Sequence, residues 1–367
     1  AILIDLAAVE LGIDGQTLAV RDGTFVYHGK ATKLDYWAVV GKHTLARQAD
    51  GSATPKSHEN YQLVGTSAER IDIPPKIFAE ASYIHDIRLQ YMLHARVVRS
   101  GDREAKLSLL PGIEVITRMP GVVRIVRDGS FLGVVAKREE QAIHAAESLS
   151  KLCQWKHKTP LPDEAMLDQW LRKAPAEVKV VAEHGFPGSA NIARTVSHAY
   201  SRPFQAHASI SPSTAIALRQ ANKLTIWSHS QGVYPLRGAI AKIVGLNENS
   251  VRCIHAQAAG CYGHNGADDA ACDAALIAMQ LEGRPIRLQW MRADEFLGEP
   301  YGSAMSTQIN AGIDASGQII DWNYDVWSGS HSTRPRGAKG AGGFFAARQI
   351  AQPLPLPPVA NMPQPRG

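Results

Sequence analysis

The sequence lacks the features that mark several classes of protein. Its four cysteines, at positions 153, 253, 261 and 272, form no CxxC pair, so neither a zinc site nor an iron–sulfur site is indicated. No uncharged apolar run approaches the length of about 20 residues that crosses a membrane. The opening residues, AILIDLAAVELG, have no basic region before the apolar ones and no initiator methionine. We therefore expect no signal peptide here and expect the true N-terminus to be missing.

The chain also lacks a large excess of charge of either sign. The 39 Lys and Arg residues nearly balance the 34 Asp and Glu residues, and the net charge is +5. The basic residues are scattered and form no run of the kind that follows a phosphate backbone, which argues against nucleic-acid binding. What is present, 45% apolar and 20% charged residues, is ordinary for a soluble globular protein. The 367 residues exceed what one hydrophobic core usually spans, so two or three domains are expected.

Composition divides the chain into four parts. They are an N-terminal segment (1–62), an α+β region (64–158), a third region (178–334) and a Gly/Pro-rich connector (335–367). The first part predicts a helix over ILIDLAAVELG, a hairpin around RDGTF and a second short helix, followed by loop formers at 47–62. A proline-containing linker (Pro160, Pro162, Pro175) precedes the third region, and the proline-rich residues 353–367 predict an extended end.

The second part has the clearest local signals. GVVRIVRDGSFLGVVAKR predicts two strands joined by a turn at Asp128-Gly129. The residues that follow, 139–152, predict a helix with one apolar face. That face consists of Ala142, Ala145, Ala146, Leu149 and Leu152.

A glycine-rich stretch in the third part, AAGCYGHNGADDAA (258–271), spaces Gly260, Gly263 and Gly266 three apart. The alternation in VRCIHAQ (251–257) predicts a strand before it, and AACDAALIAMQLEG predicts a helix after it that ends near Gly283. Asp268 and Asp269 suit the helix N-terminus by capping and by charge–dipole attraction. PIRLQWM predicts the next strand. The loop therefore lies where backbone N–H groups meet an anion or a polar cofactor edge.

The glycines alone leave two interpretations open. The spacing is GxxGxxG, not the GxGxxG of dinucleotide folds, and no GK[ST] follows, so a tight structural turn is as good an explanation as a ligand site. A second stretch, LTIWSHSQGVYPLRGAIAKIVGL (224–246), predicts a strand, a polar turn and a helix, with Gln231 in the turn. A Gln amide both donates and accepts, which suits a position beside a metal oxo group, although a surface loop is the commoner place for a Gln.

Together these stretches resemble the molybdopterin-binding subunit of the xanthine dehydrogenase/aldehyde oxidase family. The resemblance rests on WSHSQGVYPLRGAIAKIVGL, VRCIHAQAAGCYGHNGADDAACDAALIA, RPIRLQWMRADEF and DVWSGSHSTRP, in this order, and is strongest to the bacterial nicotinate dehydrogenase and isoquinoline oxidoreductase-type branch. Residues 64–100 are similar to the opening of that family's α/β hammerhead domain. The fold expected from the resemblance is α+β: a hammerhead-like domain followed by part of a molybdenum-cofactor-binding α+β domain.

The resemblance also implies a cofactor, a reaction and partners. The cofactor is a molybdenum cofactor, molybdopterin, in its cytosine dinucleotide form in many bacteria. The reaction is hydroxylation of an aldehyde or N-heterocycle at carbon, with the oxygen taken from water. Electrons leave through a small subunit with [2Fe–2S] clusters, and some relatives add a cytochrome c subunit. Members of this branch can carry export signals, so the periplasmic side of a bacterium is slightly favoured over the cytoplasm.

Site residues are implied position by position. Gln231 matches the glutamine that hydrogen-bonds the molybdenum oxo ligand, and the loop Gly260, Cys261, Tyr262 and Gly263 matches the glycine–aromatic loop on the pterin. His264 belongs to the same cofactor-binding stretch, but it and Asn265 depart from the family's glycine and lysine, which argues against a purine substrate. The metal is held by the pterin dithiolene, so no protein ligand is expected and Cys261 is interpreted as a small packed thiol.

Other residues fit the resemblance less directly. In RPFQAHASISPS (202–213), Ser211-Pro212 stands where many members have Glu-Pro, and His207 is interpreted as packed or at the surface. Trp290, Trp322 and Trp327 are expected in the core.

No Gly-Glu motif of the kind that carries the family's catalytic base occurs in the chain, and Glu295 and Glu299 have the wrong context. We therefore expect an internal portion, or one piece of a divided subunit, completed by a further chain. The alternative is a scaffold that binds cofactor or partner subunits without turnover alone.

Overall fold

The computed structural model describes residues 1–46, 48, 51, 53–157, 161–185, 191–329 and 337–357. The chain divides into two compact units, Ala1–Ile73 and Pro74–Gly367. Parts of the predicted linker (158–160) and of the predicted connector (358–367), and the end of DVWSGSHSTRP, lie outside the described residues. The four domain boundaries drawn from composition stay a prediction.

The first unit is a small α/β fold with its own core. It consists of α1 (Ile2–Leu11), β1 (Leu18–Arg21), β2 (Thr24–Tyr27), β3 (Lys30–Asp35) and α2 (Tyr36–Lys42). The predicted helix, hairpin and second helix are confirmed, and the hairpin gains β3 as a third antiparallel strand. Both helices contribute to one core with the sheet, formed by Ala7, Ala8, Leu18, Phe25, Leu34 and Val39.

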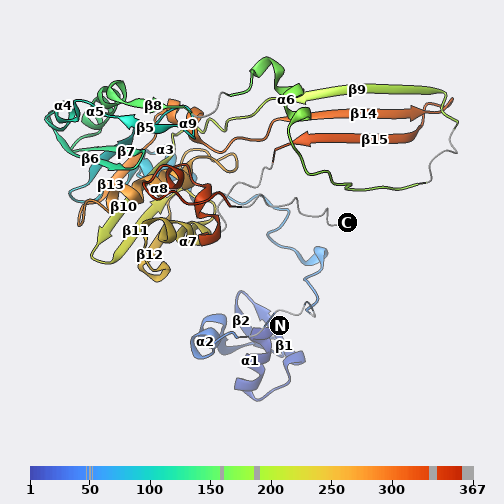
Figure 1. Cartoon of the computed structure of the whole chain (residues 1–367). Helices are drawn as coiled ribbons and strands as arrows, with labels where there is room; N and C mark the ends of the chain where they lie inside the picture. Colours follow the sequence, from blue (N-terminus) through green and yellow to red (C-terminus); the bar gives the residue numbers. More distant parts are fainter. Residues whose placement is uncertain are drawn as a thin grey trace. The chain divides into compact units, whose positions relative to one another are not determined.

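A mixed seven-stranded sheet organises the second unit (Figure 1). Its order is β12-β11-β10-β13-β4-β7-β6. The strands are β4 (Leu93–Val97), β6 (Val122–Asp128), β7 (Phe131–Ala136), β10 (Thr214–Gln220), β11 (Lys223–Ser228), β12 (Val251–His255) and β13 (Ile286–Gln289). Parallel pairing of β13 with β4 joins strands from the second and third parts of the sequence in one sheet. The predicted hairpin at Asp128-Gly129 is confirmed as β6 and β7.

Helices cover both faces of this sheet. The helices α7 (Val233–Val244) and α8 (Ala267–Ala278) pack in one core with Phe131 and Val135 of β7. The helix α5 (Glu139–Leu152) packs on the opposite face against Leu132 and Val134. Every residue of β7 is therefore buried, as expected for a strand with two covered faces. The predicted helix over 139–152 is confirmed, with Ala142, Ala145, Ala146 and Leu149 buried.

The remaining elements are shorter or lie at the edges. They are α3 (Ile73–Ile77), β5 (Lys106–Leu109), α4 (Ile113–Thr117), β8 (Gln154–Lys156), α6 (Leu167–Lys173) and α9 (Arg292–Gly298). Two 3₁₀ helices, Gly337–Gly343 and Ala346–Arg348, flank Phe344 and Phe345, whose rings are buried. This part of the predicted connector packs into the main core.

A second, antiparallel sheet is formed by β9 (Arg194–Arg202), β14 (Met305–Ile313) and β15 (Ile319–Ser328), in the order β15-β14-β9 (Figure 1). The expectation that Trp322 lies in the core is wrong, because nearly all of β15 is exposed and Trp322 itself is 55% exposed. Trp327 is half-buried beneath the guanidinium of Arg172, whose central carbon lies 4.5 Å from the ring centroid. Trp290 is fully buried, as predicted.

Candidate functional site

The predicted strand–loop–helix around the glycines is present. β12 ends at His255, α8 begins at Ala267, and the loop between them carries Gly260 and Gly263 at φ of 104° and 105°. Such backbone angles favour glycine. A β-carbon on Gly260 would lie 3.0 Å from the hydroxyl of Tyr262 and 3.2 Å from the backbone nitrogen of Ile210. The loop can therefore lie close to Tyr262 and Ile210 because Gly260 has no side chain.

Tyr262 forms the outer corner of this loop. It is a non-glycine residue in the left-handed region, at φ 57°, and its side chain is 59% exposed. Tyr262 is therefore not a core aromatic. The ring lies over Gly260, so an aromatic side chain faces solvent directly beside the glycine backbone.

Gln231 lies in the turn between β11 and α7, as predicted, and its side chain reaches the glycine loop. Its Nε2 donates a hydrogen bond to Sγ of Cys261 at 2.8 Å. The thiol of Cys261 in turn donates to the backbone oxygen of Gly263 at 3.3 Å. Two stretches that are 30 residues apart in the sequence are thus joined at the residues singled out for cofactor binding.

Asn265 fixes the base of the loop. Its Nδ2 donates to Oγ of Ser209 and to the backbone oxygen of Cys261, and its Oδ1 accepts the backbone N–H of Ala267 at 3.1 Å. The expected capping by Asp268 and Asp269 is therefore only partly right. Both lie in the first turn of α8, where their charge suits the helix dipole, but Asn265 satisfies the terminal N–H.

Asp269 instead ties α8 to the C-terminal segment. Its Oδ1 accepts the backbone N–H of Phe345 at 2.8 Å, and burial raises its pKa.

Ser211 joins the other side of the loop, because its backbone N–H donates to the oxygen of Ala259 and its Oγ accepts the N–H of Ala259. The segment RPFQAHASISPS thus runs beside the start of the glycine loop, as an ordered site requires.

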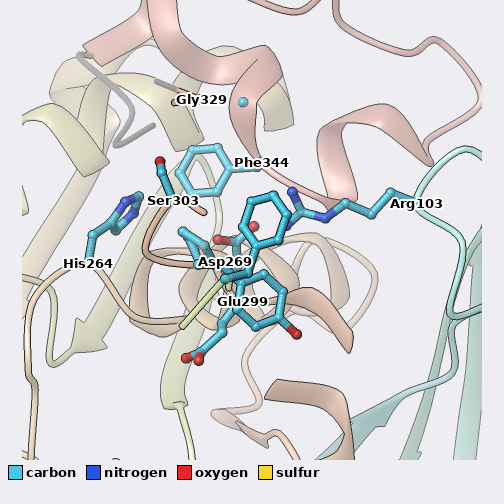
Figure 2. A pocket seen from close by; sticks show the side chains of 11 residues that line it. Arg103, His264, Asp269, Glu299, Ser303, Gly329 and Phe344 are labelled. Atoms are coloured by element: carbon cyan, nitrogen blue, oxygen red, sulfur yellow. The ribbon is translucent and has the colours of Figure 1, made fainter. Parts of the chain in front are cut away.

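A cavity of about 220 Å³ adjoins the far end of the loop (Figure 2). His264 contributes to its wall, and Nε2 of this residue lies 3.6 Å from Oδ2 of Asp268. The other lining residues combine aromatic rings with charged groups: Arg103, Phe204, Asp269, Glu299, Pro300, Tyr301, Ser303, Gly329, Gly343 and Phe344. Figure 2 shows the carboxylate of Asp269 between Ser303 and Arg103.

A pair that the sequence did not predict, the half-buried His207 and the buried Glu299, lies beside the loop. Oε1 of Glu299 accepts the backbone N–H of His207 at 2.6 Å, and Oε2 lies 3.6 Å from Nδ1 of the ring. The other ring nitrogen lies 3.4 Å from where a β-carbon of Gly263 would stand. Burial raises the pKa of Glu299. Since 92 residues separate the two, no local pattern in the sequence predicts the pair.

The arrangement suits a polar planar ligand better than a directly bound metal. Among the described residues, no group of three or more His, Cys, Asp or Glu side chains could hold a metal ion. The half-exposed edge of the loop instead combines backbone, an amide side chain and an aromatic ring. All of the predicted site residues, Gln231, Gly260, Cys261, Tyr262, Gly263 and His264, lie in or against this one loop.

The chain is similar to known proteins that bind a molybdenum cofactor. Residues 177–338 match the molybdopterin cofactor-binding domain family. A nicotinate dehydrogenase subunit of Pseudomonas putida is 38% identical over 334 residues, 88% of this chain and 28% of that protein. The isoquinoline 1-oxidoreductase beta subunit of Brevundimonas diminuta is 23% identical over 78% of this chain and 38% of its own. The molybdenum-binding subunit of an Escherichia coli aldehyde oxidoreductase, PaoC, is 24% identical over 74% and 41%.

Solved structures show the same fold. Quinoline 2-oxidoreductase from Pseudomonas putida 86 superposes with a TM-score of 0.56 at 16% identity, covering 71% of this chain and 39% of that one. The aldehyde oxidoreductase of Desulfovibrio gigas gives 0.55 at 18% identity, covering 70% and 33%. The predicted α+β fold class is confirmed.

Residues 177–338 thus match the molybdopterin cofactor-binding domain family, and the chain is similar to molybdenum-binding subunits of the xanthine dehydrogenase/aldehyde oxidase type, as its motifs predicted. It spans between 28% and 41% of the length of the curated relatives described above. Those relatives come from bacteria. No helix among the described residues is long and apolar enough to cross a membrane, and the comparisons lend no support to the periplasmic location favoured from the sequence.

Proposed function

We propose that this chain forms the pterin-facing part of a molybdenum hydroxylase that oxidises an aldehyde or an N-heterocycle. One observation carries the proposal: within residues 177–338, which match the molybdopterin cofactor-binding domain family, the Gln231 side chain and the glycine loop, both implied as cofactor contacts by the family resemblance, meet at a 2.8 Å contact. The 38% identity to a nicotinate dehydrogenase subunit favours an N-heterocycle over an aldehyde.

The residues present fit such a cofactor. A pterin is planar and rich in hydrogen-bonding groups, so it needs backbone that can be approached closely. Gly260 and Gly263 fit this need, since they carry no side chain that would keep a ligand from the backbone and they allow the φ angles of 104° and 105° at which the loop is folded. Gln231 is exposed at the same edge and can donate through its amide nitrogen.

Each residue then has a defined task. When bound, the molybdenum cofactor supplies the two-electron oxidation of the substrate carbon, with oxygen taken from water. Gln231 would hold the metal end of the cofactor through a hydrogen bond from its amide, and the backbone of the 260–263 loop would hold the pterin. The exposed ring of Tyr262 forms a wall that orients substrate and excludes water. The cytosine dinucleotide form of the cofactor, a [2Fe–2S] electron-transfer partner, a cytochrome c subunit and a further segment with a Gly-Glu base complete the proposed enzyme.

Metal analysis of the enzyme purified with its partner subunits tests the proposal. We expect close to one molybdenum per copy of this chain. Gln231→Leu removes the donor, and we expect it to keep the metal but lower turnover per molybdenum roughly 10- to 100-fold, the size of one hydrogen bond to a charged group. Gln318→Leu, an exposed position between β14 and β15, is the matched control and should retain both properties. A purified wild-type complex without molybdenum would refute the proposal.

A further inference from the structure

The Gln231 amide contacts a thiol. Gln231 follows a polar turn and is exposed, so its long side chain gains little from packing and would lose rotamer freedom if fixed. The bond from its Nε2 to Sγ of Cys261 supplies a fixed point. An amide nitrogen carries two hydrogens. The bond to sulfur uses one of them and so sets the direction of the other.

The sulfur is itself held in place. Its own hydrogen is donated to the backbone oxygen of Gly263, so its lone pairs are left to accept from Gln231. The backbone oxygen of Cys261 accepts from Nδ2 of Asn265, which also anchors the first N–H of α8. A continuous chain of hydrogen bonds therefore runs from the helix N-terminus through Asn265 and Cys261 to the Gln231 amide.

We propose that Cys261 is the positioning residue that orients the Gln231 amide for its ligand. This inference rests on the function proposed for Gln231 and deepens it. Alanine at position 261 would break the chain at its centre, whereas serine would keep both a donor and an acceptor on a shorter arm. Cys153 offers a matched control, because its thiol is also half-buried and also donates to a backbone oxygen, that of Leu149, at 3.3 Å.

The first test needs no cofactor. In the full chain labelled with ¹⁵N at Gln side chains, the signal pair lost in Gln231→Leu identifies Gln231. We expect Cys261→Ala to move this pair toward the position of an unconstrained side chain and to speed its exchange with water. Cys261→Ser should keep it near the wild-type position, and Cys153→Ala should leave it unchanged. An unmoved pair in Cys261→Ala would overturn the proposal.

The second test uses the assembled enzyme. We expect Cys261→Ala to lower kcat per molybdenum about twofold to tenfold, the loss associated with one neutral hydrogen bond, with KM and metal content unchanged. Serine should restore at least half of the loss. A fall in metal content without a change in kcat per molybdenum would contradict the positioning role. Failure of the wild-type complex to carry molybdenum would instead refute the proposed function, and the amide signals would still report whether the contact exists.

Discussion

The indole nitrogen of Trp290 donates a 2.8 Å hydrogen bond to Oδ2 of Asp273, and both side chains are fully buried. Asp273 also forms an ion pair with Arg99, whose guanidinium carbon lies 4.7 Å from the ring centroid of Phe345. Burial nevertheless raises the pKa of Asp273 to about 6. A polar pair in the middle of α8 thus connects the end of β13, the helix that follows the glycine loop, and the C-terminal segment.

Trp290→Phe should destabilise the protein strongly. It removes the donor to a buried carboxylate and leaves a small cavity, so we expect a loss of about 2–4 kcal/mol in the free energy of unfolding. Urea denaturation measures this. Trp322→Phe, at an exposed position of β15, is the control and should change stability by less than about 0.5 kcal/mol. Equal effects of the two substitutions would show that the pair to Asp273 contributes little.

Gly266→Ala should disturb the start of α8 by crowding. A β-carbon there would lie 2.6 Å from Cζ3 of Trp290 and 2.9 Å from Oγ of Ser213, neither of which can move freely in the core. Overpacking of this kind costs about 1–3 kcal/mol. Gly41→Ala, within α2, meets nothing within 4 Å and should be neutral or slightly stabilising. The melting temperatures of both variants measure this difference. An unchanged melting temperature in Gly266→Ala would contradict the close packing of Gly266 against Trp290 and Ser213.

His229 should make the fold sensitive to acid. It lies two residues before Gln231, its Nε2 accepts the N–H of Thr214 at 3.3 Å, and burial lowers its pKa from 6.5 to about 4. His85 and His255 add to this shift, and Asp268 opposes it. Because the depressed pKa belongs to the folded state, its stability is intact above pH 6.5 and is lost as the pH falls toward 4.

Protonation of His229 is expected to lower the free energy of unfolding by about 3 kcal/mol, because its pKa falls from 6.5 in the unfolded chain to about 4 in the folded protein. His229→Gln cannot be protonated, so its stability should fall less steeply between pH 7 and 4 when denaturant midpoints are compared. His198→Gln, at an exposed position on β9, should follow the wild type. Parallel curves for His229→Gln and wild type would rule out this role.

Substitutions of Tyr262 distinguish a contact with substrate from a role in stability. Because its ring is largely exposed, neither Tyr262→Phe nor Tyr262→Ala should lower the melting temperature by much. In the assembled enzyme, Tyr262→Phe should keep the cofactor and weaken kcat/KM for polar substrates by roughly 0.5–1.5 kcal/mol. Tyr262→Ala should lose more, since the wall itself is removed. Activity per molybdenum that stays constant in Tyr262→Ala would end the functional assignment.

The sequence by itself determined those elements whose structure depends only on residues adjacent in the chain. The apolar spacing at 139–152 predicted α5, and Asp128-Gly129 predicted the turn between β6 and β7. The glycine spacing likewise located the loop before α8, because positive φ angles are accessible to glycine whatever surrounds it. The ordered series of motifs gave the family, which the comparisons support.

Tertiary packing decided which side chains meet. Three contacts at the site could not be predicted from strand or helix periodicity. They are the bond of Gln231 to Cys261, the pair of His207 and Glu299, and the cap that Asn265 provides for α8. Trp322 shows the same limit, since an apolar residue is buried only if its strand has a covered face. Local patterns fix which face of an element is apolar, but only the arrangement of the sheets and helices determines what lies against that face.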